Sequence, residues 1–107
     1  MSKYILLSRV TEQGRRTIKQ NPERIKEVNS EVEKMGAKVL SQYALLGMYD
    51  FLTVIEAPNN ETIAKVSVEF SSRGTVEIQS LPAFEVDDFI NMVKKQAKGG
   101  GKPKPKS

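Results

Sequence analysis

The sequence predicts an α+β domain with the element order β-α-β-β-α-β and one further helix at its C-terminal end. Short runs of β-forming residues alternate with two segments whose apolar residues recur at helical spacing. In the central stretch 45–58, Gly47 supplies the backbone freedom of a turn between two strands, and Pro58 stops the second strand. These observations predict a hairpin in the middle of the chain, with a helical crossover on either side.

The first half of the chain begins with a strand at residues 4–10, whose two faces are both largely apolar. Residues 11–20 form a polar connector, in which we expect at most a short helical turn around Ile18. A helix then begins at Asn21-Pro22-Glu23, with Asn21 as the cap and proline at the first helical position. One face of this helix is apolar, and its residues are Ile25, Val28, Val32 and Met35.

The second half of the chain continues this pattern. Strands are predicted at residues 37–46 and 49–57, and Asn59 or Asn60 caps a second helix that ends at Gly74. The buried stripe of this helix is Ile63, Val66 and Phe70. Residues 75–81 alternate as a fourth strand that Pro82 closes, and a third helix covers residues 86–97.

This order is the ferredoxin-like plan, an antiparallel sheet with helices on one face. In a monomer, the uncovered sheet face should carry polar residues. The first and third strands are instead apolar on both faces. In the first strand, Ile5 and Leu7 lie on one face and Leu6 and Val10 on the other; in the third, Leu52 and Val54 lie on one face and Phe51 and Ile55 on the other. We therefore expect the open faces of two copies to pack together in a homodimer, or in a higher homo-oligomer.

Composition excludes several classes of function. The chain of 107 residues contains no cysteine and no histidine, so a thiol nucleophile, a histidine base and the usual metal and haem ligands are missing. We expect no metal site and no cofactor. No apolar run approaches the roughly 20 residues of a membrane span, and residues 1–4 lack a signal-peptide pattern. A cytoplasmic protein without membrane contact is the expectation.

The net charge of +4 comes from the tail. Residues 98–107 contain four lysines and no acid; without them, 13 basic residues balance the 13 acidic ones. We expect residues 1–97 to form the domain and residues 98–107 to form a flexible Gly/Pro/Lys-rich tail. A neutral body does not favour nucleic acid as a partner. RNA-binding domains of the same topology stack bases on aromatics of the third strand, but here Asp50 lies beside Tyr49 and Phe51 and would repel phosphate.

Asp50 and Tyr49 follow the central turn and are candidate site residues. Asp50 is a candidate catalytic acid or base, or a ligand for a polar group; the alternative is that its carboxylate caps backbone amides of the turn. Tyr49 either donates its hydroxyl to a ligand or packs its ring at the sheet edge with the hydroxyl in water.

Arg9 and Glu56 complete the set of candidate ligand-binding residues. Arg9 could hold an anionic ligand, or pair with Asp50 or Glu56 or with a residue across a dimer. Glu56 and Glu77 could form a paired-carboxylate site, although spacing alone does not fix their separation. The adjacent acids Asp87 and Asp88 are explained by the helix start at which they lie.

With the topology and the turn in hand, the chain resembles the GYD family of small bacterial and archaeal proteins. The resemblance covers residues 4 to about 97 and depends on YILLSRVTEQG, on PERIKEV, on the turn with Asp50, and on Glu56-Ala57-Pro58. Met48 separates Gly47 from Tyr49, so Tyr49-Asp50 carries the match to the family's Gly-Tyr-Asp sequence. The family is similar to the dimeric α+β barrel proteins, which include ligand-binding regulators, cofactor-free enzymes and haem enzymes, so the fold does not select one function.

Two functions follow as hypotheses. The first is a homo-oligomeric domain that binds a small molecule or has a structural or regulatory role. The alternative is a cofactor-independent enzyme that uses Asp50 as acid or base, with Tyr49 and Arg9 orienting the substrate.

Overall fold

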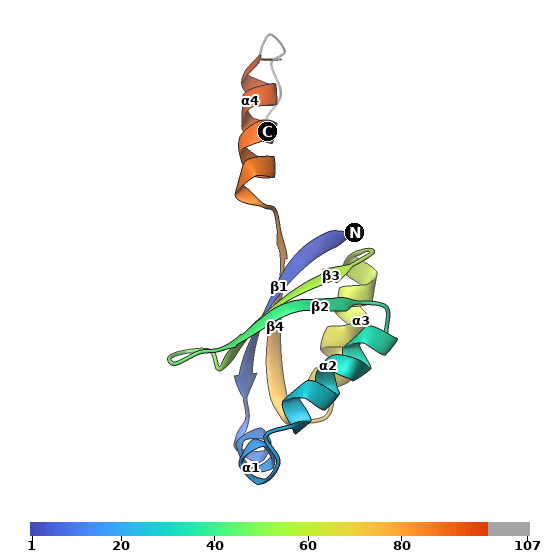
Figure 1. Cartoon of the computed structure of the whole chain (residues 1–107), viewed down its shortest axis with the longest axis vertical. Coiled ribbons are helices and arrows are strands. Elements are labelled where there is room, and N and C mark those ends of the chain that lie inside the picture. The colour runs from blue at the N-terminus through green and yellow to red at the C-terminus, as the bar shows by residue number, and fades with distance from the viewer. Residues whose placement is uncertain (99–107) are drawn as a thin grey trace.

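The computed structural model describes residues 1–98, which form a four-stranded antiparallel sheet and four helices (Figure 1). In chain order the elements are β1 (Ser2–Val10), α1 (Glu12–Gln20), α2 (Arg24–Lys34), β2 (Lys38–Ala44), β3 (Phe51–Ala57), α3 (Asn60–Ser71), β4 (Val76–Ala83) and α4 (Val86–Lys98). The strand order is β2-β3-β1-β4, and every neighbouring pair is antiparallel. The predicted ferredoxin-like α+β fold is confirmed.

The connector after β1 is more ordered than the sequence predicted, because residues 12–20 form the complete helix α1. Thr11 is its N-cap, and the Thr11 hydroxyl accepts a hydrogen bond from the Gly14 amide at 3.2 Å. Gly14 is the buried residue of this helix, and it allows α1 to lie directly against the end of the sheet. The expectation of only a short helical turn was wrong, since a capping threonine and this close contact stabilise a largely polar segment.

The predicted cap of the next helix was also wrong. Asn21 is the C-cap of α1, and its amide donates to the Thr17 carbonyl. The helix α2 starts later, after Glu23, whose side chain makes no capping hydrogen bond. Since α1 already uses Asn21, Pro22 lies in the turn between the two helices rather than at the first helical position.

The remaining boundaries agree with the sequence more closely. Asn59 is the N-cap of α3, and its Oδ1 accepts from the Thr62 amide at 2.9 Å. Gly47 has a φ of +129°, so the turn between β2 and β3 uses a conformation that favours glycine. Pro82 does not close the fourth strand: β4 continues to Ala83, with Pro82 opposite Tyr4. Proline is tolerated there because β4 is an edge strand.

The helices α2 and α3 lie on one face of the sheet, which we call the covered face, and the core lies between them (Figure 1). The most deeply buried residues come from alternate positions of β1 and β3 and from the apolar stripes of α2 and α3. They are Tyr4, Leu6, Val32, Ala37, Ile55, Ala57, Ile63, Val66 and Phe70. Period-2 alternation in the strands therefore directs one set of residues to the helices and the other to the opposite face.

The predicted flexible tail begins at Lys98, which is the last residue of α4. The rest of that segment, residues 99–107, lies outside the described residues.

Candidate functional site

The candidate residues Arg9, Tyr49 and Asp50 lie at one corner of the sheet, beside the β2–β3 turn. The Arg9 guanidinium carbon is 5.6 Å from the centre of the Tyr49 ring, and Arg9 Nε donates to the Met48 carbonyl at 3.2 Å. The Tyr49 hydroxyl donates to Gln79 Oε1 at 2.6 Å. Arg9 forms no ion pair with any described residue; Glu77 is its neighbour across β4.

Asp50 connects the turn to the end of β1. Its Oδ2 accepts a hydrogen bond from the Val10 amide at 2.7 Å, and its own amide donates to the Ser8 carbonyl at 2.8 Å. Its carbonyl accepts from the Leu45 amide at 2.8 Å. The carboxylate therefore satisfies a backbone donor, as the capping interpretation expects, although the amide belongs to β1 rather than to the turn itself.

Glu56 lies at the opposite end of β3 from Asp50. It faces Lys3 across β1 and Lys38 across β2. Glu56 is six positions after Asp50, which corresponds to about 20 Å of extended strand. The structure therefore brings three of the four predicted site residues together and leaves Glu56 elsewhere, and Glu77 is nearer to Arg9 than to Glu56 in the sheet register.

The face of the sheet opposite the helices, which we call the open face, is apolar at its centre. Ile5 on β1 lies between Val54 on β3 and Leu81 on β4, and Leu7 lies beside Leu52. The central side chains of β1 and β3 are half-buried, whereas Leu81 on β4 is 36% exposed and Tyr43 on β2 is 58% exposed. None of the described helices covers this surface (Figure 1).

Helix α4 is a second uncovered apolar surface. It lies beyond the end of β4, away from the other helices, and makes at most marginal contact with the other described elements (Figure 1). An ion pair between Lys3 and Glu85 lies at its base, and the hydrogen bond and charge of Glu85 raise the pKa of Lys3. One stripe of the helix is apolar and between 41% and 71% exposed; its residues are Val86, Phe89, Ile90 and Val93.

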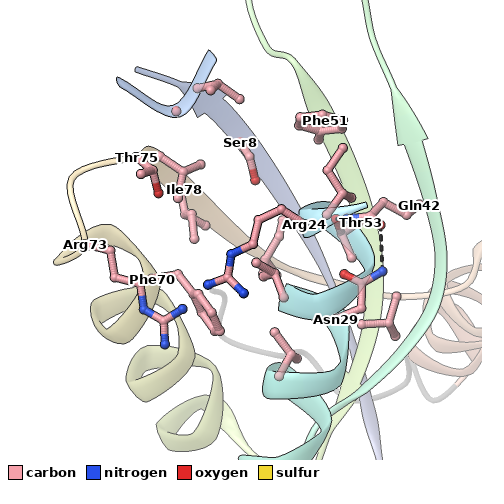
Figure 2. Close-up of a pocket in the computed structure, with 18 of the residues that line it drawn as sticks. Ser8, Arg24, Asn29, Gln42, Phe51, Thr53, Phe70, Arg73, Thr75 and Ile78 are labelled. Carbon is pink, nitrogen blue, oxygen red and sulfur yellow. Dashed lines mark hydrogen bonds between the residues drawn. The ribbon is translucent and has the colours of Figure 1, made fainter. Parts of the chain in front are cut away.

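A cavity of about 400 Å³ lies under the helices, on the covered face of the sheet. Figure 2 shows it between α2, α3 and the strands. Its walls are mainly apolar, and prominent among them are Val10, Ile18, Val28, Phe51 and Ile78. None of Arg9, Tyr49 and Glu56 lines it, and Asp50 lines a separate shallow depression with Arg15 and Lys19.

The sequence contains one signal for this cavity. On the covered face of β1, the half-buried Ser8 lies between the buried residues Leu6 and Val10. A small polar residue in the middle of a core-facing strand leaves unfilled volume above it. The cavity also depends on how α1 and α2 sit above the sheet, which no periodic pattern encodes.

A few polar side chains interrupt the apolar wall. Asn29 Nδ2 donates to Gln42 Oε1 at 2.8 Å, and Gln42 Nε2 donates to Thr53 Oγ1 at 3.1 Å (Figure 2). Arg24 extends from the start of α2 into the cavity, and Arg73 lies beside Phe70 at the end of α3 (Figure 2). The arrangement can hold an apolar molecule that has one or two polar groups.

Two further facts limit the chemistry of the described residues. Within residues 1–98, no group of three or more Asp, Glu, His or Cys side chains could hold a metal ion. None of the helices described in this range is both long enough and apolar enough to cross a membrane.

The strand order, the antiparallel register and the helices on one face define a ferredoxin-like α+β protein. The family model of the GYD domain matches residues 4–93, which is most of the chain. The chain therefore belongs to the GYD family, and the resemblance predicted from its sequence is confirmed.

A relative from Thermus thermophilus is similar over its whole length. It is described as "Glutamine synthetase and cystathionine beta-lyase binding protein" and is 45% identical over 95 residues. The match covers 88% of this chain and 100% of the relative. The family thus includes a protein described by the enzymes that it binds, which agrees with a binding role.

Proposed function

We propose that this protein is a cytoplasmic homodimer that binds a metabolic enzyme and regulates or scaffolds it. The observation that carries the proposal is the pair of apolar surfaces, the open face and α4, that the described chain leaves uncovered. A small soluble protein rarely exposes apolar patches of this kind unless another protein covers them.

The open face is the proposed dimer interface. Its centre is apolar, and charged side chains such as Arg9, Glu77 and Lys3 lie toward its ends. This arrangement of an apolar core and a polar rim is typical of protein interfaces. A two-fold axis through the centre would place Ile5 and Val54 of one copy against the same residues of the other.

Helix α4 is the proposed arm that each copy places against its partner. Its apolar stripe is too exposed to contribute to its own domain, and the helix begins just after β4, at the margin of the open face. Burying Phe89 and Val93 on the second copy would cover apolar surface that otherwise faces water.

The proposed enzyme partner follows from the relative in Thermus thermophilus. The two proteins are 45% identical over the whole relative, which supports a similar fold and a similar kind of partner. We propose glutamine synthetase or cystathionine β-lyase, or an enzyme of the same kind, as the partner of this chain. The dimer leaves the helix side free for that contact.

Sedimentation velocity at micromolar concentration tests the dimer. Wild type should sediment as a dimer, and Val54→Lys should sediment as a monomer that retains its circular dichroism spectrum. The matched control is Val68→Lys, because Val68 is 68% exposed on α3, away from the open face. A monomeric wild type, or a Val68→Lys variant as monomeric as Val54→Lys, would contradict the proposed interface.

Binding of the enzyme is tested separately. Glutamine synthetase and cystathionine β-lyase from the source organism of this chain should each be immobilised and titrated with the full chain in surface plasmon resonance. Saturable binding to at least one of them supports the proposal, and bovine serum albumin serves as the control surface. Binding to neither enzyme would overturn the assignment of the partner but not the dimer.

A further inference from the structure

We infer that the cavity on the covered face is a binding site for an apolar molecule that has a single carboxylate. This site is separate from the proposed dimer interface, because it lies on the opposite side of the sheet from the open face. Its volume of about 400 Å³ is within the range of small-molecule sites, roughly 300–1,000 Å³.

The walls of the cavity select an apolar body. Val10, Ile18, Val28, Phe51 and Ile78 line it from α1, α2 and three strands. The residues that line its deep end, among them Ile55 and Val66, are almost completely buried. An apolar chain in this space would exchange contact with water for contact with these side chains.

Arg24 supplies the polar contact. Both of its ion pairs use the same nitrogen: Nη1 is 3.2 Å from Glu27 Oε1 and 3.4 Å from Glu31 Oε2. Its Nε and Nη2 bond to none of the described residues, and Figure 2 shows the guanidinium pointing into the cavity. Two adjacent N–H groups on one edge of a guanidinium match the two oxygens of a carboxylate.

The other arginine of the cavity does not offer this edge. Arg73 Nη1 is 2.6 Å from Glu31 Oε1, Nη2 is 2.9 Å from Glu69 Oε2, and the guanidinium lies 4.5 Å from the centre of the Phe70 ring. These bonds hold Arg73 against α2 and α3. Among the described residues, Arg24 is therefore the cation of this cavity in which two adjacent nitrogens, Nε and Nη2, are both left to bind a ligand.

The local charge favours a monoanion over a dianion. Glu27 and Glu31 both lie beside the Arg24 guanidinium, so a phosphate monoester with two negative charges would meet two carboxylates at the same place. A carboxylate brings one negative charge and can bind the Nε–Nη2 edge while Glu27, which is more than half exposed, keeps its contact with Nη1.

The small side chain of Ser8 leaves room in the cavity for the apolar part of the ligand. It lies on the covered face of β1 among larger apolar residues, and it lines the cavity. Leucine at this position would occupy the space that the apolar body needs. Since filling a cavity usually stabilises a fold, Ser8→Leu should remove binding without loss of stability.

Isothermal titration calorimetry with sodium decanoate, 1-decanol and decyl phosphate tests the inference on the full chain. Decanoate should bind with one molecule per chain and more tightly than the other two probes. Arg24→Gln should weaken decanoate about 10- to 100-fold, the range for a lost charged hydrogen bond, and leave decanol within about twofold. Arg16→Gln is the matched control, because Arg16 also pairs with a helical glutamate but lies outside the cavity, and it should change neither.

Ser8→Leu should abolish decanoate binding while its melting temperature stays equal to or above that of wild type. Undiminished binding to Ser8→Leu would place the ligand elsewhere, on the open face for example, and overturn the inference. Equal binding of decanoate to wild type and Arg24→Gln, tighter binding of decyl phosphate, or no binding of any probe would also overturn it.

Discussion

The two faces of the sheet are built from alternate residues of the same strands, but helices pack against one face and leave the other uncovered. On β3, Thr53 and Ile55 are buried beneath the helices, whereas Leu52 and Val54 are only half-buried on the open face. The covered face combines apolar packing with a chain of polar side chains and a cavity. The open face is apolar at its centre, and the cavity lies on the other side of the sheet. One strand therefore contributes residues both to the core and to the open face, and the open face is as apolar at its centre as the core.

The largest effect should separate the two faces directly. Ile55 is fully buried and Val54 is its neighbour on the open face. Ile55→Ala should lower the free energy of unfolding by about 2–5 kcal/mol because it leaves a cavity in the core. Val54→Ala should cost about 1 kcal/mol or less in dilute solution. Urea denaturation at equal low concentration measures both, and equal losses would mean that the two faces are buried alike.

A second test concerns how the helices are held on the covered face. A Cβ atom at Gly14 would lie 2.2 Å from the Thr75 carbonyl oxygen and 2.6 Å from Val10 Cγ1. Gly14→Ala should therefore displace α1 and destabilise the fold by about 1–3 kcal/mol, despite the better helix propensity of alanine. Gln13→Ala, one residue earlier on the exposed side of α1, is the control and should be nearly neutral. A stabilised Gly14→Ala variant in thermal melts would show that α1 does not lie this close to the sheet.

A third test is at the corner where the covered and open faces meet. Asp50→Ala leaves the Val10 amide without its acceptor and should cost about 0.5–2 kcal/mol, by analogy with a lost helix cap. Asp50→Asn keeps an acceptor oxygen and should cost little. If Asp50 is instead a functional carboxylate, the alanine variant should be as stable as wild type or more stable. Thermal melts of both variants distinguish the two, and the enzyme hypothesis remains a prediction until then.

The smallest effect is a pH dependence of the helix layer. The hydrogen bond from Arg73 holds the pKa of Glu31 below its ordinary value of 4.5. The ionised form is therefore favoured by folding, and its contribution is complete above the unfolded pKa and lost as pH falls through the folded one. The melting temperature should fall between about pH 5 and pH 3, and less steeply in Glu31→Gln.

Glu85 shows the same direction of shift, because Lys3 lowers its pKa at the base of α4. Both sites are solvent-exposed, so the change should be small and should shrink at high salt. Glu85→Gln is the matched comparison: if it flattens the pH profile more than Glu31→Gln does, the acid sensitivity lies at α4 and not in the helix layer.

The sequence predicted the strands, the buried stripes and the topology because these depend on periodicity. Ile63, Val66 and Phe70 are buried as the helical spacing of the second helix required. It did not predict α1, whose residues are nearly all polar and include a glycine; its Thr11 cap was the available signal.

Other features could not be predicted because they depend on the assembled sheet. Proline usually ends a strand, but β4 continues through Pro82 because β4 is an edge strand. Only the strand order of the folded sheet shows that β4 lies at the edge. At the candidate site, Arg9 lies over the Tyr49 ring, and a binding role for these residues stays a prediction. The cavity, with Arg24 and Thr53 in its wall, could not be predicted. It depends on the distance between the helix layer and the sheet, and the pattern of residues along the chain contains no information on that distance.

The edges of the sheet have a consequence for solubility. An uncovered strand edge is a template for adding strands from other chains, which leads to fibrous aggregation. Pro82 removes one backbone donor from the β4 edge, and the register shift between Val39 and Ser41 makes the β2 edge irregular. Growth of the sheet from chain to chain is thereby hindered at both ends. The protein can thus expose an apolar sheet face without forming fibres. Association through a face stops at a dimer, whereas pairing along a strand edge could continue from chain to chain without limit.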